Sequence, residues 1–248
     1  MKTWLPVLTL VFFALQGCKK DDRITFEPIA YKSDPCAACP KVEINIPNAL
    51  EETPISQTIN NSLKEEIIFL LTFEEGVDVT SIEEALSSFK RAYLDQKNTF
   101  LDESIGWEAK IDGEVTHEDK NILTIQVKAY VFTGGAHGYS PTRFLNFNKV
   151  KGLEMDNLDL FKDQEAFLRF AEARFRQQEG VPQDTDINST GFMFEDNIFH
   201  LPENMGFTQT GLQLFYDQYE IASYADGPIV VDIPMVEVKP FLDPAIIP

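Results

Sequence analysis

The strongest constraint on the fold is an alternation of apolar and polar residues over positions 123–132. Leu123, Ile125 and Val127 begin the apolar series, and polar or larger side chains stand between them. A period of two is typical of a strand with one buried face. Residues 105–115 are expected to pair with this strand, because the polar stretch 117–121 between them indicates a turn. Further strands are expected over residues 42–46, 143–148, 212–217 and 229–233.

Three other segments repeat their apolar residues every three or four positions, which indicates amphipathic helices. The first begins at Thr53 as N-cap with Pro54 at the first position, and is expected to end at Gly76. The second begins near Thr80 or Ser81, and the third runs from Asp163 to Gly180. Residues 181–210 are rich in loop-forming residues. We therefore expect an α+β fold, a mainly antiparallel sheet packed with about three helices.

The N-terminus indicates export and a lipid anchor. Residues 1–18 combine Lys2, a short apolar stretch and Gly17-Cys18, which is typical of a lipoprotein signal peptide. On this interpretation Cys18 carries the lipid, and the alternative is an ordinary secreted protein. Residues 19–22 resemble the tag that follows the lipidated cysteine in surface lipoproteins of Bacteroidetes. We expect a cell-envelope protein at the outer membrane, with residues 19–47 as a tether.

Cys36 and Cys39 form a CxxC pair in that tether. A local disulfide is expected in an oxidising envelope. Redox chemistry would need a helix after the pair, whereas Pro40 and a strand follow. A structural zinc site would need about four ligands and no second CxxC exists, so disulfide, metal and redox roles remain open in that order.

The charge of the chain limits its partners. Acidic residues number 40 against 21 basic ones, a net charge of −19, which argues against nucleic-acid binding. Removal of residues 1–18 takes away one lysine and no acid, leaving −20. No Walker loop, dinucleotide fingerprint or HExxH motif occurs, so no cofactor is expected. His117, Glu118 and Asp119 could hold a metal, but they lie in the expected turn and we predict no metal site.

A glycine-rich string, Thr133-Gly-Gly-Ala-His-Gly138, lies between two predicted strands. Such glycines indicate positive φ or a close backbone approach. The string is either a structural turn or a pocket that presents His137 to a ligand. Near the C-terminus Tyr216, Tyr219, Glu220 and Tyr224 gather, either as a recognition surface or as tyrosines half-buried at a sheet edge with their hydroxyls in water.

Two segments together resemble a known pair of domains. One is Val131 to Gly138, continuing to Leu158-Asp-Leu-Phe161, and the other is Phe215-Tyr216 to Tyr219-Glu-Ile-Ala222 and on to Gly227. They are similar to the paired domains of unknown function in the ectodomain of RsiV-type anti-sigma factors and in front of the catalytic domain of PdaC-type peptidoglycan deacetylases. The resemblance covers residues 48–240. It implies a PdaC/RsiV-like half over 48–150 and an RsiV-like half over 151–248.

The resemblance implies a module that acts by binding, since the RsiV-type ectodomain recognises lysozyme. This sequence departs from both families in having neither an expected transmembrane helix nor a deacetylase-sized extension, so the motif residues are expected to bind rather than catalyse. The expected function is a lipid-anchored envelope binding module for lysozyme or a cell-wall glycan such as peptidoglycan. The alternative is an envelope hydrolase with His137 and a carboxylate as general acid and base. The expected binding residues are Gly134, Gly135, His137, Gly138, Tyr139, Tyr219 and Tyr224.

Overall fold

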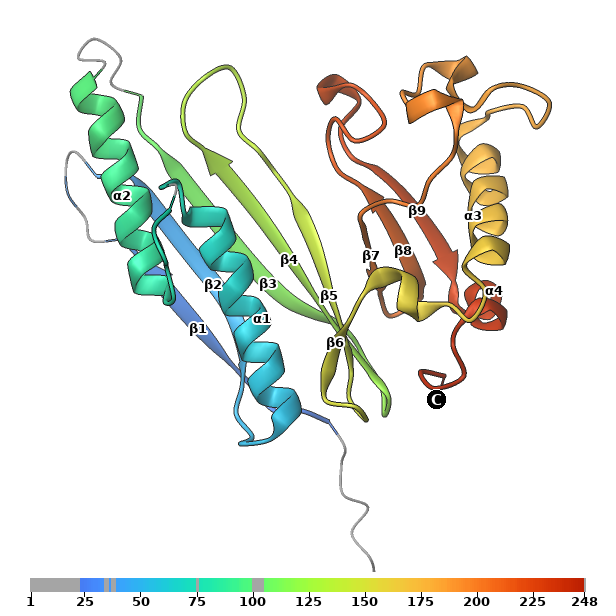
Figure 1. Cartoon of the computed structure of the whole chain (residues 1–248), viewed down its shortest axis with the longest axis horizontal. Helices are drawn as coiled ribbons and strands as arrows, with labels where there is room; N and C mark the ends of the chain where they lie inside the picture. Colours follow the sequence, from blue (N-terminus) through green and yellow to red (C-terminus); the bar gives the residue numbers. More distant parts are fainter. Residues whose placement is uncertain (1–22, 34–35, 37–38, 75, 100–104, 248) are drawn as a thin grey trace, which may run out of the picture.

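A computed structural model describes residues 23–33, 36, 39–74, 76–99 and 105–247 (Figure 1). The predicted signal peptide 1–18, Cys18 and the following residues 19–22 lie outside the described residues. Across the ranges that are described, no helix combines the length and the apolar character needed to span a bilayer.

A six-stranded sheet occupies the first part of the chain, with its strands in sequential order. All neighbouring strands pair antiparallel except β2 and β3, which are parallel because helices α1 and α2 form the connection between them. Figure 1 shows both helices on the same face of this sheet. The strands are β1 (Phe26–Lys32), β2 (Lys41–Ala49), β3 (Glu108–Glu118), β4 (Ile122–Phe132), β5 (Thr142–Asn148) and β6 (Leu153–Met155).

Helix α1 (Pro54–Leu71) begins where the sequence predicts. The Thr53 side chain accepts a hydrogen bond from the Ser56 N–H at 3.3 Å, which satisfies one of the free donors of the first turn. The helix ends at Leu71 with an extended Thr72, so the predicted end at Gly76 is wrong. Helix α2 (Ile82–Thr99) also begins as predicted.

Strand β4 lies between β3 and β5, so the predicted strand is confirmed. Its first half is buried on both faces rather than one, because Thr124 and Gln126 are buried as fully as the apolar residues beside them. The predicted 105–115 strand and 117–121 turn are displaced, because a bulge between Val115 and His117 carries the pairing of β3 on to Glu118. The turn is shorter, and the Asp119 carboxylate closes it by accepting from the N–H of Asn121 at 2.7 Å and of Ile122 at 2.8 Å.

The second part of the chain forms a three-stranded antiparallel sheet of β7 (Asn204–Phe207), β8 (Gly211–Tyr216) and β9 (Ile229–Pro234). Helices α3 (Gln164–Glu179) and α4 (Met235–Val238) pack with it (Figure 1). The ends of α3 match the prediction: Asp163 caps its N-terminus and Gly180 ends it at φ +69°. The α+β prediction with a mainly antiparallel sheet is confirmed.

The sheet begins earlier than predicted. Residues 19–47 were expected to be a tether, but β1 pairs with β2 from Phe26↔Ala49 to Lys32↔Glu43. The predicted division at residue 150 falls in the turn between β5 and β6, so β6 remains with the first sheet. Strand β7 lies inside the stretch predicted to be loop.

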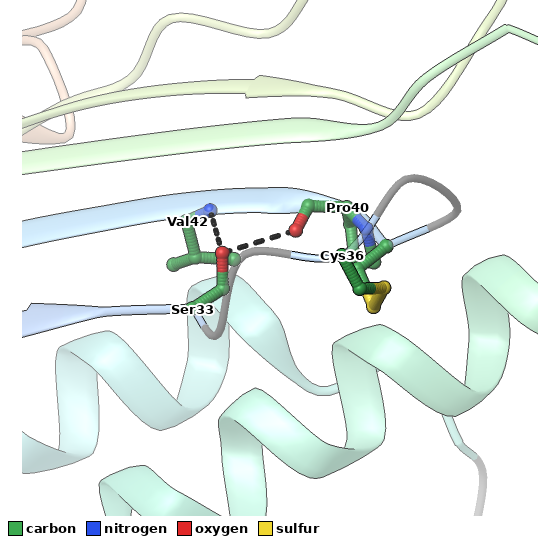
Figure 2. Close-up of a disulfide and its surroundings, with 5 residues drawn as sticks. Ser33, Cys36, Pro40 and Val42 are labelled. Atoms are coloured by element: carbon green, nitrogen blue, oxygen red, sulfur yellow. Dashed lines mark hydrogen bonds between the residues drawn. A yellow bond between two sulfur atoms is a disulfide. The ribbon is translucent and has the colours of Figure 1, made fainter.

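Cys36 and Cys39 form the predicted disulfide in the loop between β1 and β2 (Figure 2). The Ser33 hydroxyl braces the same loop, since it donates to the Pro40 carbonyl at 3.1 Å and accepts from the Val42 N–H at 3.0 Å.

Each part of the chain has its own hydrophobic core. The first is largely aliphatic, with one aromatic group in which Trp107 contacts Phe73, Phe89 and Tyr93 at ring distances of 5.3–6.0 Å. The second is rich in phenylalanine, with Phe175 contacting several rings and Phe161 stacked on Phe167 at 3.7 Å.

A polar seam joins the two halves along β7. Side chains of the first half donate to carbonyls of the second: Asn146 to Met205 at 2.8 Å and Thr116 to Phe207 at 2.7 Å. Gly206 lies between these carbonyls, and a Cβ there would overlap the Phe144 ring of β5. A residue with no side chain therefore lets β7 approach the first sheet.

This close approach makes Gly206→Ala a test of the seam. Overpacking against Phe144 should lower the free energy of unfolding by about 1–3 kcal/mol in urea denaturation. Gly106→Ala is the matched control, because nothing lies within 4 Å of its Cβ position and its φ is not positive. Equal stability of the two variants would contradict the described packing.

Candidate functional site

The glycine-rich string forms the connection between β4 and β5. Its ends are held by a bridge in which Val131 and Tyr139 exchange backbone hydrogen bonds, both 2.8 Å. Gly134 and Gly135 have φ of +104° and +85°, and a Cβ on Gly138 would overlap the Tyr130 ring. Both expectations for these glycines, positive φ and close approach, are confirmed.

His137 is exposed at this connection and stacks on Tyr224. The ring centroids are 4.2 Å apart and the planes are 21° from parallel. Tyr224 in turn lies 5.5 Å from the Tyr219 ring, at 37°. The two sequence strings that carry the family resemblance thus meet in one surface of three rings, which we call the aromatic surface.

Tyr219 has an unusual backbone for an aromatic residue. Its φ is +71°, and its side chain is 65% exposed. A bulky residue in the left-handed region costs stability unless its surroundings impose that conformation. Here Glu220 holds the turn, since its carboxylate accepts from the N–H of Asp217 at 2.8 Å and of Glu203 at 3.0 Å. The turn therefore presents a ring to solvent at the expense of backbone strain.

Tyr130 and Tyr139 extend the exposed aromatic area beside the string, at 40% and 50% exposure. Burial raises the pKa of the Tyr139 phenol, although the charge of Arg143 acts in the opposite direction. The Tyr139 phenol is therefore a neutral donor near neutral pH. Tyr130 stands at one of the positions between the apolar residues of the 123–132 alternation.

A hydrogen-bond network around Asp217 connects the glycine string to the turn that contains Tyr219, residues 217–224, which we call the tyrosine turn. Its carboxylate accepts from the Thr142 N–H at 3.0 Å, from Asn204 Nδ2 at 3.1 Å and from Arg143 Nη1 at 3.3 Å. Arg143 also lies 3.8 Å from the Glu66 carboxylate of α1. The network joins α1, β5 and the end of β8, so it fixes the glycine string relative to the tyrosine turn.

Three carboxyl groups of this region have a raised pKa. Burial is the main cause for Glu66, Asp217 and Glu220. For Glu66 the attraction of Arg143 is weaker than the desolvation, and its Oε1 has no hydrogen-bond partner within the described part of the chain. A buried carboxylate without a full set of donors is costly in its charged form.

Four of the seven predicted binding residues lie in the glycine string and Tyr139 directly follows it. Tyr219 and Tyr224 lie in the tyrosine turn after β8, and the structure brings the two segments together. Tyr216 does not belong with them: it is buried, and its hydroxyl donates to the His200 carbonyl at 2.7 Å. Sequence reasoning missed Glu66, Arg143 and Asp217. They lie in different elements with no characteristic spacing, and only the pairing of the halves joins them.

The structure gives little geometric support to the catalytic role of His137 or to a metal site at His117. His137 contacts Tyr224, and in the described residues no carboxylate lies within hydrogen-bond distance of its ring. His117 faces the seam instead, with Nδ1 3.2 Å from the Thr208 carbonyl and Nε2 3.4 Å from Asp119. Over the described ranges, no three His, Cys, Asp or Glu side chains gather as metal ligands.

The raised pKa of Glu66 predicts a pH dependence of stability. A carboxyl group with a raised native pKa contributes stability that is present below its unfolded pKa and is lost as pH rises through its native pKa. Glu66→Gln should therefore flatten the decline of unfolding free energy from pH 4 upward, as measured by urea denaturation at several pH values. Glu65→Gln on the exposed side of α1 is the control, and a wild-type decline in Glu66→Gln would contradict the assignment.

Two family models match the chain in tandem. The model described as deacetylase PdaC matches residues 36–140, and DUF3298, described as a protein of unknown function, matches residues 158–235. The aromatic surface takes His137 from the first match and its two tyrosines from the second. No curated protein matches the chain at a significant level.

Solved structures share this fold. The crystal structure of a DUF3298 family protein from Pseudomonas aeruginosa PAO1 has a TM-score of 0.66 at 22% identity, covering 92% of this chain and 98% of that one. A DUF3298 family member from Bacteroides fragilis NCTC 9343 has a TM-score of 0.65 at 20% identity, covering 89% and 94%. The solved structures share the fold, and the two model matches support the paired domains of unknown function that the two strings predicted, a PdaC-type region followed by a DUF3298 region.

Proposed function

We propose that this chain is a lipid-anchored cell-envelope binding module whose ligand surface is the aromatic surface of His137, Tyr219 and Tyr224. The observation that carries the proposal is the meeting of the two motif strings. Residues about 80 positions apart supply three neighbouring rings to one surface, with His137 and Tyr219 exposed and Tyr224 half-buried, and Tyr219 is held there in a strained backbone. Exposed tyrosines supply large contact area with little loss of rotamer entropy, which suits recognition.

Charge favours a basic protein as the ligand, with lysozyme as the leading candidate. The chain carries a net −19, and Glu203, Asp217 and Glu220 lie around the tyrosine turn with Arg143 as their basic neighbour. A negative surface attracts a basic partner mainly by raising the association rate. Lysozyme recognition by RsiV-type ectodomains supports the same choice by resemblance.

A cell-wall glycan is the second candidate, because flat rings near parallel can also contact the apolar face of a sugar. The hydrolase alternative has weaker support. Among the described residues His137 has an aromatic neighbour and no carboxylate to orient it, so the general acid–base pair it would need is absent.

Ring removal tests the proposed surface. Tyr224→Ala should weaken binding to egg-white lysozyme at least tenfold in isothermal titration calorimetry, because Tyr224 contacts both other rings. Tyr219→Gly should do the same without loss of stability, since glycine accepts the left-handed backbone. Val150→Ala, 73% exposed in the turn at the other end of β5, is the control.

The same titration separates the candidates. Wild-type binding that weakens with added salt supports a basic protein, since screening reduces the attraction between exposed charges. If lysozyme does not bind at low salt but insoluble peptidoglycan retains the wild type and not Tyr224→Ala, the glycan is the ligand. Retention of both activities by Tyr224→Ala and Tyr219→Gly would remove the aromatic surface from the proposal.

The lipid anchor has its own test at Cys18, which lies outside the described residues. Cys18→Ala should move the protein from the membrane fraction to the soluble fraction of the envelope, because no acyl chain can then be attached. Fractionation followed by immunoblotting measures this. A variant that stays with the membranes would contradict lipid attachment at this cysteine.

A further inference from the structure

A cavity of about 250 Å³ lies between the first sheet and the two helices that cover it. Its lining comes from strands β1 and β2, from helix α1 and from the first turn of α2. Figure 1 shows these four elements together at the edge of the six-stranded sheet where β1 is the outermost strand. The cavity belongs to the first half of the chain and takes no residue from the aromatic surface.

The walls of this cavity are fixed by hydrogen bonds. Asn60 ties α1 to the end of β2, because its amide accepts from the Ala49 N–H at 2.9 Å and donates to the Ala49 carbonyl at 3.0 Å. At the start of α2 the Ser81 hydroxyl accepts from the Glu84 N–H at 3.2 Å, and the Glu84 carboxylate accepts from the Thr80 N–H at 2.8 Å. A site that is ordered before binding loses less entropy when a ligand arrives.

The lining combines apolar surface with a few polar groups. The buried residues Ile46, Leu63 and Ile82 supply the apolar part. The side-chain amides of Asn48 and Asn61 make no hydrogen bond to another described residue, so both are free for a ligand. This combination is typical of small-molecule sites. The volume is below the roughly 300–1,000 Å³ of sites for drug-sized ligands, which limits the ligand to the size of an amino acid or a dipeptide.

Two opposite charges border the same cavity. Lys64 comes from α1 and Glu83 from α2, and within the described chain neither has an oppositely charged group within 4.0 Å. Burial and the charge of Glu83 together raise the pKa of the Tyr31 phenol, which therefore remains a neutral donor. A ligand with one charge would pair with one of the two groups and be repelled by the other. A ligand that carries both charges satisfies both.

We propose that this cavity binds a small zwitterion, an α-amino acid or a dipeptide with an apolar side chain. Lys64 receives the carboxylate and Glu83 receives the ammonium group. The amides of Asn48 and Asn61 and the Tyr31 hydroxyl bond to the remaining polar atoms of the ligand. The apolar part of the lining contacts the ligand's side chain.

The test is a titration followed by ¹⁵N–¹H NMR, with L-leucine, L-leucinamide and N-acetyl-L-leucine as probes. Leucinamide lacks the negative charge and N-acetylleucine lacks the positive one, while the side chain stays the same. Leucine should shift the amides of Asn61, Lys64 and Glu83, and each analogue should bind about tenfold more weakly. Glycyl-L-leucine distinguishes the two ligand sizes: tighter binding than leucine assigns the site to dipeptides, and weaker binding assigns it to free amino acids.

Two charge variants complete the test. Lys64→Gln should weaken leucine binding about tenfold and strengthen leucinamide binding, because the charge that repels this cation is gone. Glu83→Gln should likewise weaken leucine binding and strengthen the binding of N-acetylleucine. A gain in affinity cannot come from misfolding. The matched controls are Lys151→Gln in the turn between β5 and β6 and Glu195→Gln in the second half, both exposed, and neither should change any affinity.

The proposal is overturned if leucine shifts none of these amides, if either analogue binds as tightly as leucine, or if Lys64→Gln and Lys151→Gln have the same affinity for leucine. None of these results involves lysozyme, peptidoglycan or the aromatic surface, so this proposal and the proposed function fail separately.

Discussion

Asp217 makes the contacts through which the two halves of the chain fix each other. Its carboxylate accepts from the backbone of Thr142 and the side chain of Arg143 in one half, and from Asn204 in the other. A partly buried carboxylate with three donors, one of them a guanidinium, is satisfied only when all of these groups are in place. Loss of one partner would leave the others desolvated and unpaired, which costs several kcal/mol in comparable networks. The orientation of the glycine string toward the tyrosine turn depends on this arrangement.

The seam between the halves combines buried hydrogen bonds with apolar contacts, since Ile122 of β4 packs into the second core and the Phe144 and Phe215 rings lie 6.4 Å apart. Buried Thr124 and Asn146 bond to each other at 2.9 Å, and Asn146 continues to the Met205 carbonyl. Directional hydrogen bonds tolerate sliding less well than an apolar contact of the same size. The halves can therefore carry a ligand surface at their junction, since the angle between them is set by bond geometry.

Local patterns in the sequence predicted the elements well. Thr53 and Asp163 cap helices as expected, and the alternation from Leu123 onward is a strand, because caps and periodicity depend on neighbouring residues. Strands β1 and β7 were missed. Pro28 and Pro35 in one stretch and the short Asn204–Phe207 run in the other resemble loop, and these strands are defined by their pairing with the next strand along the chain rather than by their own residue pattern.

The candidate site likewise combines features that the sequence indicated with contacts that it did not. Gly134 and Gly138 stood out as residues with special backbone requirements and Tyr219 as part of an aromatic cluster, so the sequence indicated where a ligand surface could form. It did not indicate that His137 and Tyr224 stack, nor that Arg143 and Asp217 meet beneath them. Those contacts depend on how the two halves of the chain pack against each other. The spacing of residues along the sequence does not encode this relative orientation.

The distribution of aromatic residues between the two cores has a spectroscopic consequence. Trp4 lies in the predicted signal peptide, so the processed chain keeps Trp107 as its one tryptophan. Its ring is packed in the first core and its indole N–H donates to Gln96 at 2.6 Å, while the second core contains phenylalanines. Tryptophan emission therefore reports on the PdaC-type half and is silent on the DUF3298 half. Compared with circular dichroism, which observes both, it shows directly whether the two halves unfold as one unit.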